Sequence, residues 1–158
     1  MKQSDIVLRL IECSIDELPA KEQELAHRAI EMTNNAYTPY SHFNVGAAIL
    51  LENGVIVAGA NQENVAFPSG TCAERSACFY AGANYPDSRF VTIAVAAREG
   101  DSKELVEKPI SPCGGCRQAL LEYEMIAGRP VKVILIGRKN VLVLPSVASL
   151  LPLAFTSF

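Results

Sequence analysis

The sequence has no cluster of lysine and arginine, no long apolar stretch near its N-terminus, and only two histidines, His27 and His42. Its 14 basic and 17 acidic residues give a net charge of −3. Nucleic-acid binding draws most of its affinity from basic side chains on phosphates, so this charge argues against a polynucleotide partner. The N-terminal sequence is acidic and amphipathic and predicts neither a signal peptide nor a membrane span, so we expect a cytoplasmic protein.

A disulfide framework is also not expected. The chain has five cysteines, an odd number, and two of them lie in a CxxC pattern. In a reducing compartment, metal binding explains this pattern better than disulfides do. Cys13 and Cys78 each lie in an apolar helical pattern and are predicted to be small buried hydrophobic residues.

The length and composition predict a folded protein with a single domain spanning residues 1–158. A chain of 158 residues buries a sizeable core without disulfides. The sequence is 49% hydrophobic and 20% charged, and it has no repeat, linker or low-complexity segment that would divide it. This composition is slightly more apolar than one core requires, which favours an oligomer over a monomer.

Apolar periodicity and turn residues predict an ordered series of helices and strands. Pro19 precedes the first helix, and Asn53-Gly54 indicates a hairpin between two strands. The second helix is expected to be capped by Ser69 or Thr71, and the third by Ser111 before Pro112. The predicted helices cover Lys21–Ala36, Cys72–Ala83 and Cys113–Tyr123, and the predicted strands cover Asn44–Leu51, Val55–Ala60, Phe90–Ala97, Val131–Gly137 and Val141–Leu144.

The order of these elements predicts the fold class. Helix, hairpin, helix, strand, helix and strand follow one another along the chain, and the strands at 90–97 and 131–137 are apolar at nearly every position. Such strands are covered by helices on both faces. We therefore expect a three-layer α/β/α sandwich around a mixed sheet.

Three cysteines and one glutamate carry the chemistry that the sequence predicts. Cys72 and Glu74 lie in Thr-Cys-Ala-Glu-Arg, and Cys113 and Cys116 lie in Pro-Cys-Gly-Gly-Cys. Three thiolates hold one zinc ion and leave its fourth tetrahedral position open, as catalytic sites do. Water bound there loses its proton near neutral pH, and Glu74 is placed to accept and pass on that proton. The pattern predicts hydrolytic chemistry.

Both cysteine segments lie at predicted helix N-termini. Free N–H groups and the helix dipole lower thiol pKa values there. Three thiolates on a divalent zinc leave a net charge of −1, which weakens the metal as a Lewis acid. We expect the Arg75 guanidinium to offset this charge by a hydrogen bond to a ligating sulfur.

Two other uses of the cysteines remain open at this point. A closed structural zinc site needs a fourth ligand, for which only His27 and His42 are available, and it gives no role to Glu74. For the cysteines, a redox CxxC is the weaker alternative. For Arg75, the alternative is an ordinary solvated position on the helix surface. The positions of the histidines, the cysteines and Arg75 in the tertiary structure distinguish these alternatives.

The chain resembles the cytidine deaminase family, in particular its small homotetrameric type with three cysteines on zinc. The resemblance covers about residues 30–155 and rests on five blocks in order. These blocks are Tyr40–Ala48, Asn61–Asn64, Cys72–Arg75, Pro112–Gln118 and Leu150–Phe155. One CxxC alone is a weak signal, whereas five ordered blocks are a specific one.

The resemblance implies deamination of cytidine and deoxycytidine to uridine and deoxyuridine in pyrimidine salvage. A zinc-activated water attacks C4 of the pyrimidine, while Glu74 protonates N3 and then the departing amine. It also implies that Asn61 and Glu63 bind the ribose 3′-hydroxyl, although the two residues alone are equally well explained as a loop cap. Phe43 packs against the base, Ala73 lies in the substrate pocket, and Phe155 reaches the base from a neighbouring subunit of a homotetramer.

The sequence departs from the family pattern at two places. Phe67 stands where many relatives carry tyrosine, so a phenolic hydrogen bond is absent there. Residues 1–19 are an N-terminal extension to which the sequence assigns no function.

Three other functions compete with this one. A deaminase of a cytosine-containing antibiotic of the blasticidin type shares the size and the zinc motif, but Asn61 and Glu63 favour a nucleoside. A polynucleotide-editing deaminase is disfavoured by the acidic charge. A non-enzymatic zinc-stabilised binding module belongs to a different class, and activity with free cytidine excludes it.

Overall fold

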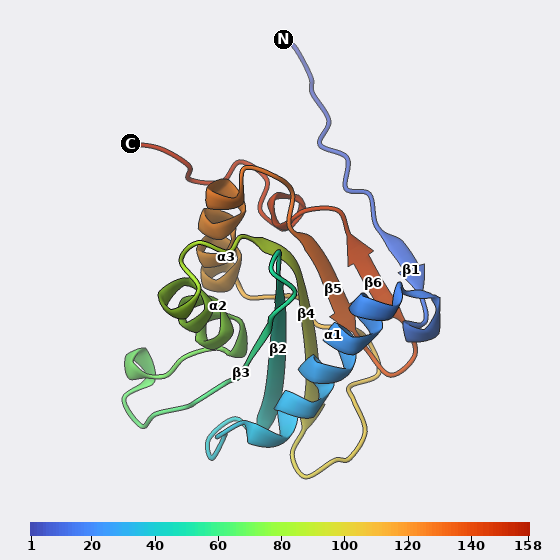
Figure 1. Ribbon diagram of the computed structural model, residues 1–158, viewed down its shortest axis with the longest axis vertical. Coiled ribbons are helices and arrows are strands. Elements are labelled where there is room, and N and C mark those ends of the chain that lie inside the picture. The colour runs from blue at the N-terminus through green and yellow to red at the C-terminus, as the bar shows by residue number, and fades with distance from the viewer.

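A six-stranded sheet with the strand order β1-β6-β5-β4-β2-β3 forms the middle layer of the computed structural model, which describes residues 1–158 (Figure 1). Strands β4 and β5 are parallel, and every other neighbouring pair is antiparallel. The predicted mixed sheet is therefore confirmed. The strands are β1 (Ile11–Cys13), β2 (Phe43–Leu51), β3 (Ile56–Ala60), β4 (Phe90–Glu99), β5 (Lys132–Ile136) and β6 (Val141–Leu144).

Three helices cover the two faces of the sheet. Helix α1 (Ala20–Met32) packs on one face, and α2 (Ala73–Asn84) and α3 (Gly114–Ala127) lie side by side on the other (Figure 1). Short 3-10 helices occupy Ile15–Glu17 (η1), Thr33–Asn35 (η2), Phe67–Ser69 (η3) and Val147–Leu150 (η4). The three-layer α/β/α sandwich is the predicted fold class. None of these helices combines the length and apolar character that a membrane crossing requires.

Alternation along the central strands divides the core into two layers. On β2, Ile49 packs with residues of α2 and α3, whereas its neighbour Ala48 packs with Leu25 and Ala29 of α1. Successive side chains of a strand point to opposite faces, so one strand supplies both layers. Strand β4 does the same, and its apolar character at nearly every position follows from this double burial.

Two glycines shape the hairpin that precedes the site. Gly54 has a φ of +85° in the turn between β2 and β3, where the predicted antiparallel hairpin forms. Gly59 lies where α2 crosses β3, and a Cβ atom there would lie 2.6 Å from the backbone nitrogen of Ala77. Because glycine has no side chain, α2 approaches the strand closely. This approach sets the position of the first turn of α2.

Several predicted boundaries need correction. Helix α1 ends at Met32 and continues only as η2, short of the predicted Ala36. The segment before Pro19 contains the edge strand β1, which pairs with β6, so Cys13 is a half-buried strand residue and not part of a helix. Its pairing partners lie about 130 residues away in the sequence, which no local pattern shows. Cys78 is fully buried, as predicted.

A buried carboxylate, that of Glu124, attaches the C-terminal segment to the C-terminal end of α3. Glu124 accepts hydrogen bonds from the backbone N–H of Val131 and Val147, each at 2.8 Å, and from the Ser146 hydroxyl at 2.7 Å. A buried carboxylate is stable only when its oxygens are bonded in this way. Glu124 therefore holds the start of η4 against α3.

Candidate active site

Two cysteines occupy the N-cap positions of the two adjacent helices. Cys72 is the N-cap of α2 and Cys113 is the N-cap of α3, and neither makes a side-chain cap hydrogen bond. The predicted caps Ser69, Thr71 and Ser111 are therefore wrong. A thiol at an N-cap lies next to the free N–H groups of the first turn, where negative charge is favoured.

The structure brings the three predicted thiols together. The Sγ atoms of Cys72, Cys113 and Cys116 all lie within 4.8 Å of one another, and those of Cys113 and Cys116 are 3.5 Å apart. Cys116 is buried on the first turn of α3, and Cys113 is exposed. One helix supplies two donors and its neighbour supplies the third, as the sequence predicts.

This donor set fits a zinc ion. Zinc bonds to thiolate sulfur are about 2.3 Å long, so a tetrahedral ion holds its sulfurs about 3.8 Å apart. The three sulfurs have this spacing to within the movement of a side chain. His27 and His42 are both exposed, and neither belongs to the cluster. A closed four-ligand structural site therefore lacks its fourth ligand.

The surroundings favour the thiolate form at Cys72 in particular. The pKa of Cys72 is lowered to about 5, chiefly by a hydrogen bond from the Cys116 thiol, with Arg75 adding to the effect against the cost of burial. The pKa of Cys116 is raised by this hydrogen bond and by burial. Arg75 Nη2 lies 3.9 Å from Cys72 Sγ, and the thiolate raises the pKa of the guanidinium. The structure thus places Arg75 beside a candidate ligand.

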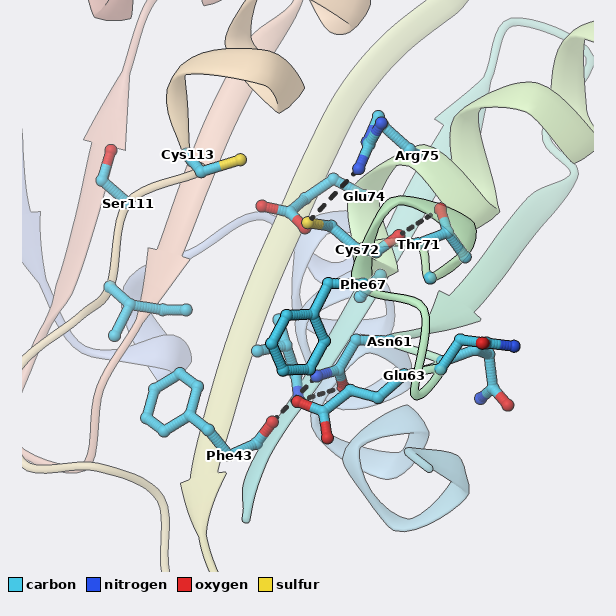
Figure 2. A pocket seen from close by; sticks show the side chains of 16 residues that line it. Phe43, Asn61, Glu63, Phe67, Thr71, Cys72, Glu74, Arg75, Ser111 and Cys113 are labelled. Carbon is cyan, nitrogen blue, oxygen red and sulfur yellow. Dashed lines mark hydrogen bonds between the residues drawn. The ribbon is translucent and has the colours of Figure 1, made fainter. Parts of the chain in front are cut away.

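Glu74 is a buried carboxyl group beside the thiols. It lies in the first turn of α2 and is only 4% exposed. Burial raises its pKa above the usual range, because an apolar environment disfavours the charged form. Figure 2 shows the carboxylate turned toward the thiols of Cys72 and Cys113. A carboxyl group whose pKa is raised by burial is better suited to hold and pass on a proton than an exposed one.

An open cavity of about 420 Å³ lies in front of these groups. This volume lies within the range of small-molecule sites. The predicted site residues in its wall are Phe43, Asn61, Glu63, Cys72, Ala73, Glu74, Arg75 and Cys113 (Figure 2). Cys116 lies behind the wall, within reach of the other two thiols.

Asn61 and Glu63 also hold the chain that forms the cavity. The Asn61 amide donates to the Phe43 carbonyl and accepts from the Val45 N–H, both at 2.8 Å. Glu63 accepts from the backbone N–H groups of Tyr40 and Ser41 at 3.0 and 3.2 Å. The amide keeps one N–H, and the carboxylate keeps lone pairs, for a ligand. Loop capping and ligand binding are therefore compatible.

Two further aromatic residues singled out in the sequence, Phe67 and Phe155, lie in different parts of the structure: Phe67 is in the cavity and Phe155 is outside it. Phe67 lines the cavity and packs edge-on against Tyr40, with ring centroids 5.9 Å apart. Phe155 is 63% exposed and does not line the cavity of its own chain. Its backbone carbonyl accepts a hydrogen bond of 2.9 Å from Gln118 Nε2. The Phe155 ring packs edge-on against Phe158 of the same tail, with ring centroids 5.4 Å apart, and lies outside the cavity.

Sequence reasoning missed other parts of the site. Thr71, Ile110 and Ser111 line the cavity, and each lies within three residues of a predicted ligand, a proximity that could have pointed to them. Arg117 lies in the family-like block Pro112–Gln118, but the sequence alone indicates no role for it. It donates to the carbonyls of Pro112 and Leu150, each at 2.7 Å, and only the tertiary structure shows this connection.

Comparisons with known proteins agree with this geometry. Residues 19–129 match the family model described as the cytidine and deoxycytidylate deaminase zinc-binding region. The cytidine deaminase of Halalkalibacterium halodurans is 38% identical over 135 residues, covering 85% of this chain and 94% of that protein. A blasticidin-S deaminase of Bacillus cereus is 29% identical over 136 residues, covering 86% and 93%.

Solved structures show the same likeness in three dimensions. A crystal structure of cytidine deaminase from Burkholderia pseudomallei is 36% identical, with a TM-score of 0.69, and the match covers 84% of this chain and 97% of that one. A cytidine deaminase from Mycobacterium leprae is 30% identical with a TM-score of 0.64, over 85% and 99% of the two chains. The resemblance stated from the five sequence blocks is confirmed.

Proposed function

The chain belongs to the cytidine and deoxycytidylate deaminase zinc-binding family, and we propose on this basis that it hydrolyses cytidine and deoxycytidine to uridine and deoxyuridine in pyrimidine salvage. The observation that carries the proposal is the cluster of three thiols beside a buried glutamate, at the wall of a cavity of small-molecule size. Cys72, Cys113 and Cys116 are proposed to hold one zinc ion, which fits the zinc-binding character of the matched family.

In the proposed mechanism, Glu74 carries the protons. Bound zinc supplies a Lewis acid that makes water nucleophilic near neutral pH. Glu74 would take one proton from the attacking water and deliver it to N3 of the base. It would then take the second proton from the hydroxyl group now on C4 and give it to the amine as the bond between C4 and nitrogen breaks, which leaves the C4 carbonyl of uridine. Cytidine and water become uridine and ammonia. Arg75 withdraws charge from Cys72, which keeps the three-thiolate site effective.

The walls of the cavity position the nucleoside. Phe43 offers an apolar face for the pyrimidine, and Ala73 borders the cavity beside Glu74. Asn61 and Glu63 lie at its other end, where their free donor and acceptor sites suit a sugar hydroxyl. Binding energy from the sugar helps to orient the base for reaction. The distribution of polar groups thus supports a nucleoside in preference to a free base.

The sugar assignment makes a separable prediction. Glu63→Ala should lower kcat/KM for cytidine by about tenfold or more, because the ribose loses an acceptor and the base loses orientation. Zinc content should stay at one ion per chain. Steady-state kinetics and elemental analysis measure the two quantities. Glu17→Ala removes a carboxylate that caps a short loop outside the cavity, through a 2.7 Å bond from the Ser14 N–H, and should leave both unchanged. Unchanged kinetics in Glu63→Ala would remove the ribose assignment.

A second candidate substrate is a cytosine-containing antibiotic of the blasticidin S type. The 29% identity to a blasticidin-S deaminase supports it, although the cytidine deaminase of Halalkalibacterium halodurans shares 38% identity with the chain. Ultraviolet absorbance assays with cytidine, deoxycytidine, cytosine and blasticidin S, run in parallel, test the proposal. We expect turnover of the two nucleosides. Turnover of blasticidin S alone would replace the proposal with the antibiotic function, and no turnover of any of them would support a binding module.

We also infer a homotetramer with composite active sites. Exposed apolar side chains gather on the outer layer and the tail: Phe79 and Tyr80 on α2, Met125 and Ile126 on α3, and Leu153, Phe155 and Phe158 after η4. Large exposed apolar patches mark interaction surfaces. The composite site places Phe155 against the pyrimidine of a neighbouring subunit. In its own chain the Phe155 ring is 63% exposed and packs only against another tail residue, Phe158.

Removing the tail tests the composite site. Deleting residues 153–158 should raise KM for cytidine, because burial of one phenylalanine is worth about 1.5–3 kcal/mol. Phe155→Ala in the full-length chain should raise KM by a similar factor, whereas deleting residues 156–158 should have the smaller effect of removing the Phe158 ring that packs against Phe155. Kinetics and sedimentation at assay concentration measure the effect. A full-length chain that is fully active as a monomer would contradict the composite site.

We also propose a cytoplasmic location and a single domain for this chain. All five cysteines are free thiols, and a site of three thiolates is best preserved in a reducing compartment, which supports a cytoplasmic location. One sheet includes strands from β1 to β6, which supports a single domain over residues 1–158. The family match starts at residue 19, so residues 1–19 are proposed as an extension that adds the edge strand β1.

A further inference from the structure

Arg117 connects the loop that carries a candidate zinc ligand to the end of η4. Its Nε donates to the Pro112 carbonyl at 2.7 Å, and its Nη2 donates to the Ser111 hydroxyl at 2.9 Å. The Pro112 carbonyl belongs to the peptide immediately before Cys113. Nη1 of the same guanidinium donates to the Leu150 carbonyl at 2.7 Å. One planar group therefore fixes two chain segments that lie far apart in the sequence.

The next residue attaches the tail at a second point. Gln118 Nε2 donates to the Phe155 carbonyl at 2.9 Å. The exposed fractions are 94% for Leu153 and 63% for Phe155, so their own side chains do little to place the tail. Leu151 and Ala154 pack only partly against the core. The two hydrogen bonds from the first turns of α3 therefore contribute much of the tail's placement.

The opposite end of η4 is held independently of the thiols. Glu124, near the C-terminal end of α3, accepts the N–H of Val147 at 2.8 Å. The start of η4 is thus fixed by the far end of α3, whereas its end at Leu150 is fixed by the helix turn that contains Cys116. Arg117 has no carboxylate partner within 4.0 Å, so its charge-assisted bonds all go to this junction.

We propose that Arg117 is a positioning residue that couples zinc binding to the placement of the C-terminal tail, with Gln118 as the second attachment. Zinc at Cys113 and Cys116 orders the loop and the first turn of α3, and the ordered turn presents Arg117 and Gln118 to the tail. Linkage is reciprocal, so zinc strengthens tail docking by the same factor by which the docked tail strengthens zinc binding. The consequence for catalysis rests on the proposed function: Phe155 is delivered to a neighbouring site only from a metal-loaded subunit.

Two measurements on the full-length protein test the coupling without substrate. Zinc affinity is obtained by competition with a chromophoric chelator, and tail docking is obtained from the rate at which carboxypeptidase removes residues after Leu150, followed by mass spectrometry. In the wild-type chain, removal of zinc should speed tail digestion by about fivefold or more, which is the usual lower range of a coupling between sites. A digestion rate that does not depend on zinc would overturn the proposal.

Variants of Arg117 separate coupling from general structure. Arg117→Gln should bind zinc about 10–100-fold more weakly, as is usual when a residue that supports a ligand is lost. Its tail should be digested rapidly with or without zinc. Arg117→Lys should be intermediate, because one ammonium group cannot reach three acceptors set for a planar fork. Arg28→Lys alters an exposed ion pair with Glu31 on α1 and should match the wild type in both measurements. An Arg117→Gln protein with wild-type zinc affinity and tail protection would overturn the proposal.

Deletion of residues 151–158 keeps the test decisive if Arg117→Gln does not fold. This deletion removes the Phe155 carbonyl, whereas Leu150 stays buried in the core beside Arg117, so zinc affinity should fall by the part of the coupling that the Gln118 attachment carries. Unchanged zinc affinity after the deletion would contradict the coupling. A chain that shows the linkage but does not deaminate cytidine contradicts only the proposed function. A chain that deaminates cytidine without the linkage contradicts only the coupling.

Discussion

Glu74→Gln should retain the fold and one zinc ion per chain while losing turnover of cytidine by about 10²–10⁴-fold or more. The amide has nearly the shape of the carboxyl group but does not accept and return protons. Glu74 is proposed to serve several proton transfers in one cycle, so the loss should reach or exceed the upper part of this range. Kinetics with cytidine, elemental analysis and circular dichroism measure activity, zinc and fold on the same sample.

A second buried glutamate provides the matched control. Glu124 is 9% exposed and accepts hydrogen bonds from Val131, Ser146 and Val147. Glu124→Gln should lower the free energy of unfolding, by about 1–3 kcal/mol for the bonds lost, but should leave the chemical step largely intact in the folded protein. If Glu74→Gln kept most of its activity, the proton transfers would belong to another group.

The zinc site should depend on three cysteines and not on the other two. Freshly purified protein should contain one zinc ion per chain, and Cys116→Ala should lose both the metal and the activity. Only Cys72, Cys113 and Cys116 have sulfurs within 4.8 Å of one another. Removing zinc with a chelator should abolish turnover, and returning zinc should restore it, since the nucleophile depends on the metal.

Cys13 and Cys78 are the controls for that prediction. Cys13 is half-buried on the edge strand β1. Cys78 lies on α2 and is buried in the hydrophobic core, where burial raises its thiol pKa to about 12. Cys13→Ser and Cys78→Ala should keep full zinc content, although Cys78→Ala loses some packing. Zinc near zero in unchelated wild-type protein, or full zinc in Cys116→Ala, would defeat the three-cysteine site.

Local sequence signals predicted the larger elements well. The hairpin at Asn53-Gly54 forms as expected, because a short turn and two adjacent strands depend on neighbouring residues. The buried strands β4 and β5 were recognisable from their continuous apolar sequences. The errors concern β1, the C-terminal end of α1 and the helix caps. Strand β1 depends on pairing with β6, and a short edge strand has little pattern of its own. Serine and threonine were favoured as caps by their usual preference, but Cys72 and Cys113 occupy those positions instead.

The sequence by itself determined the chemistry of the site: three thiols, one carboxyl group and one guanidinium at spacings that suit zinc and proton transfer. It also determined the pairing of Cys113 with Cys116, because one helical turn brings residues three apart together. Only the tertiary structure decided that Cys72 meets them, because α2 and α3 must first pack side by side on the sheet. The tertiary structure also decided that Arg117 joins the ligand loop to Leu150. Contacts between distant segments depend on how whole layers pack, which no local window of sequence contains.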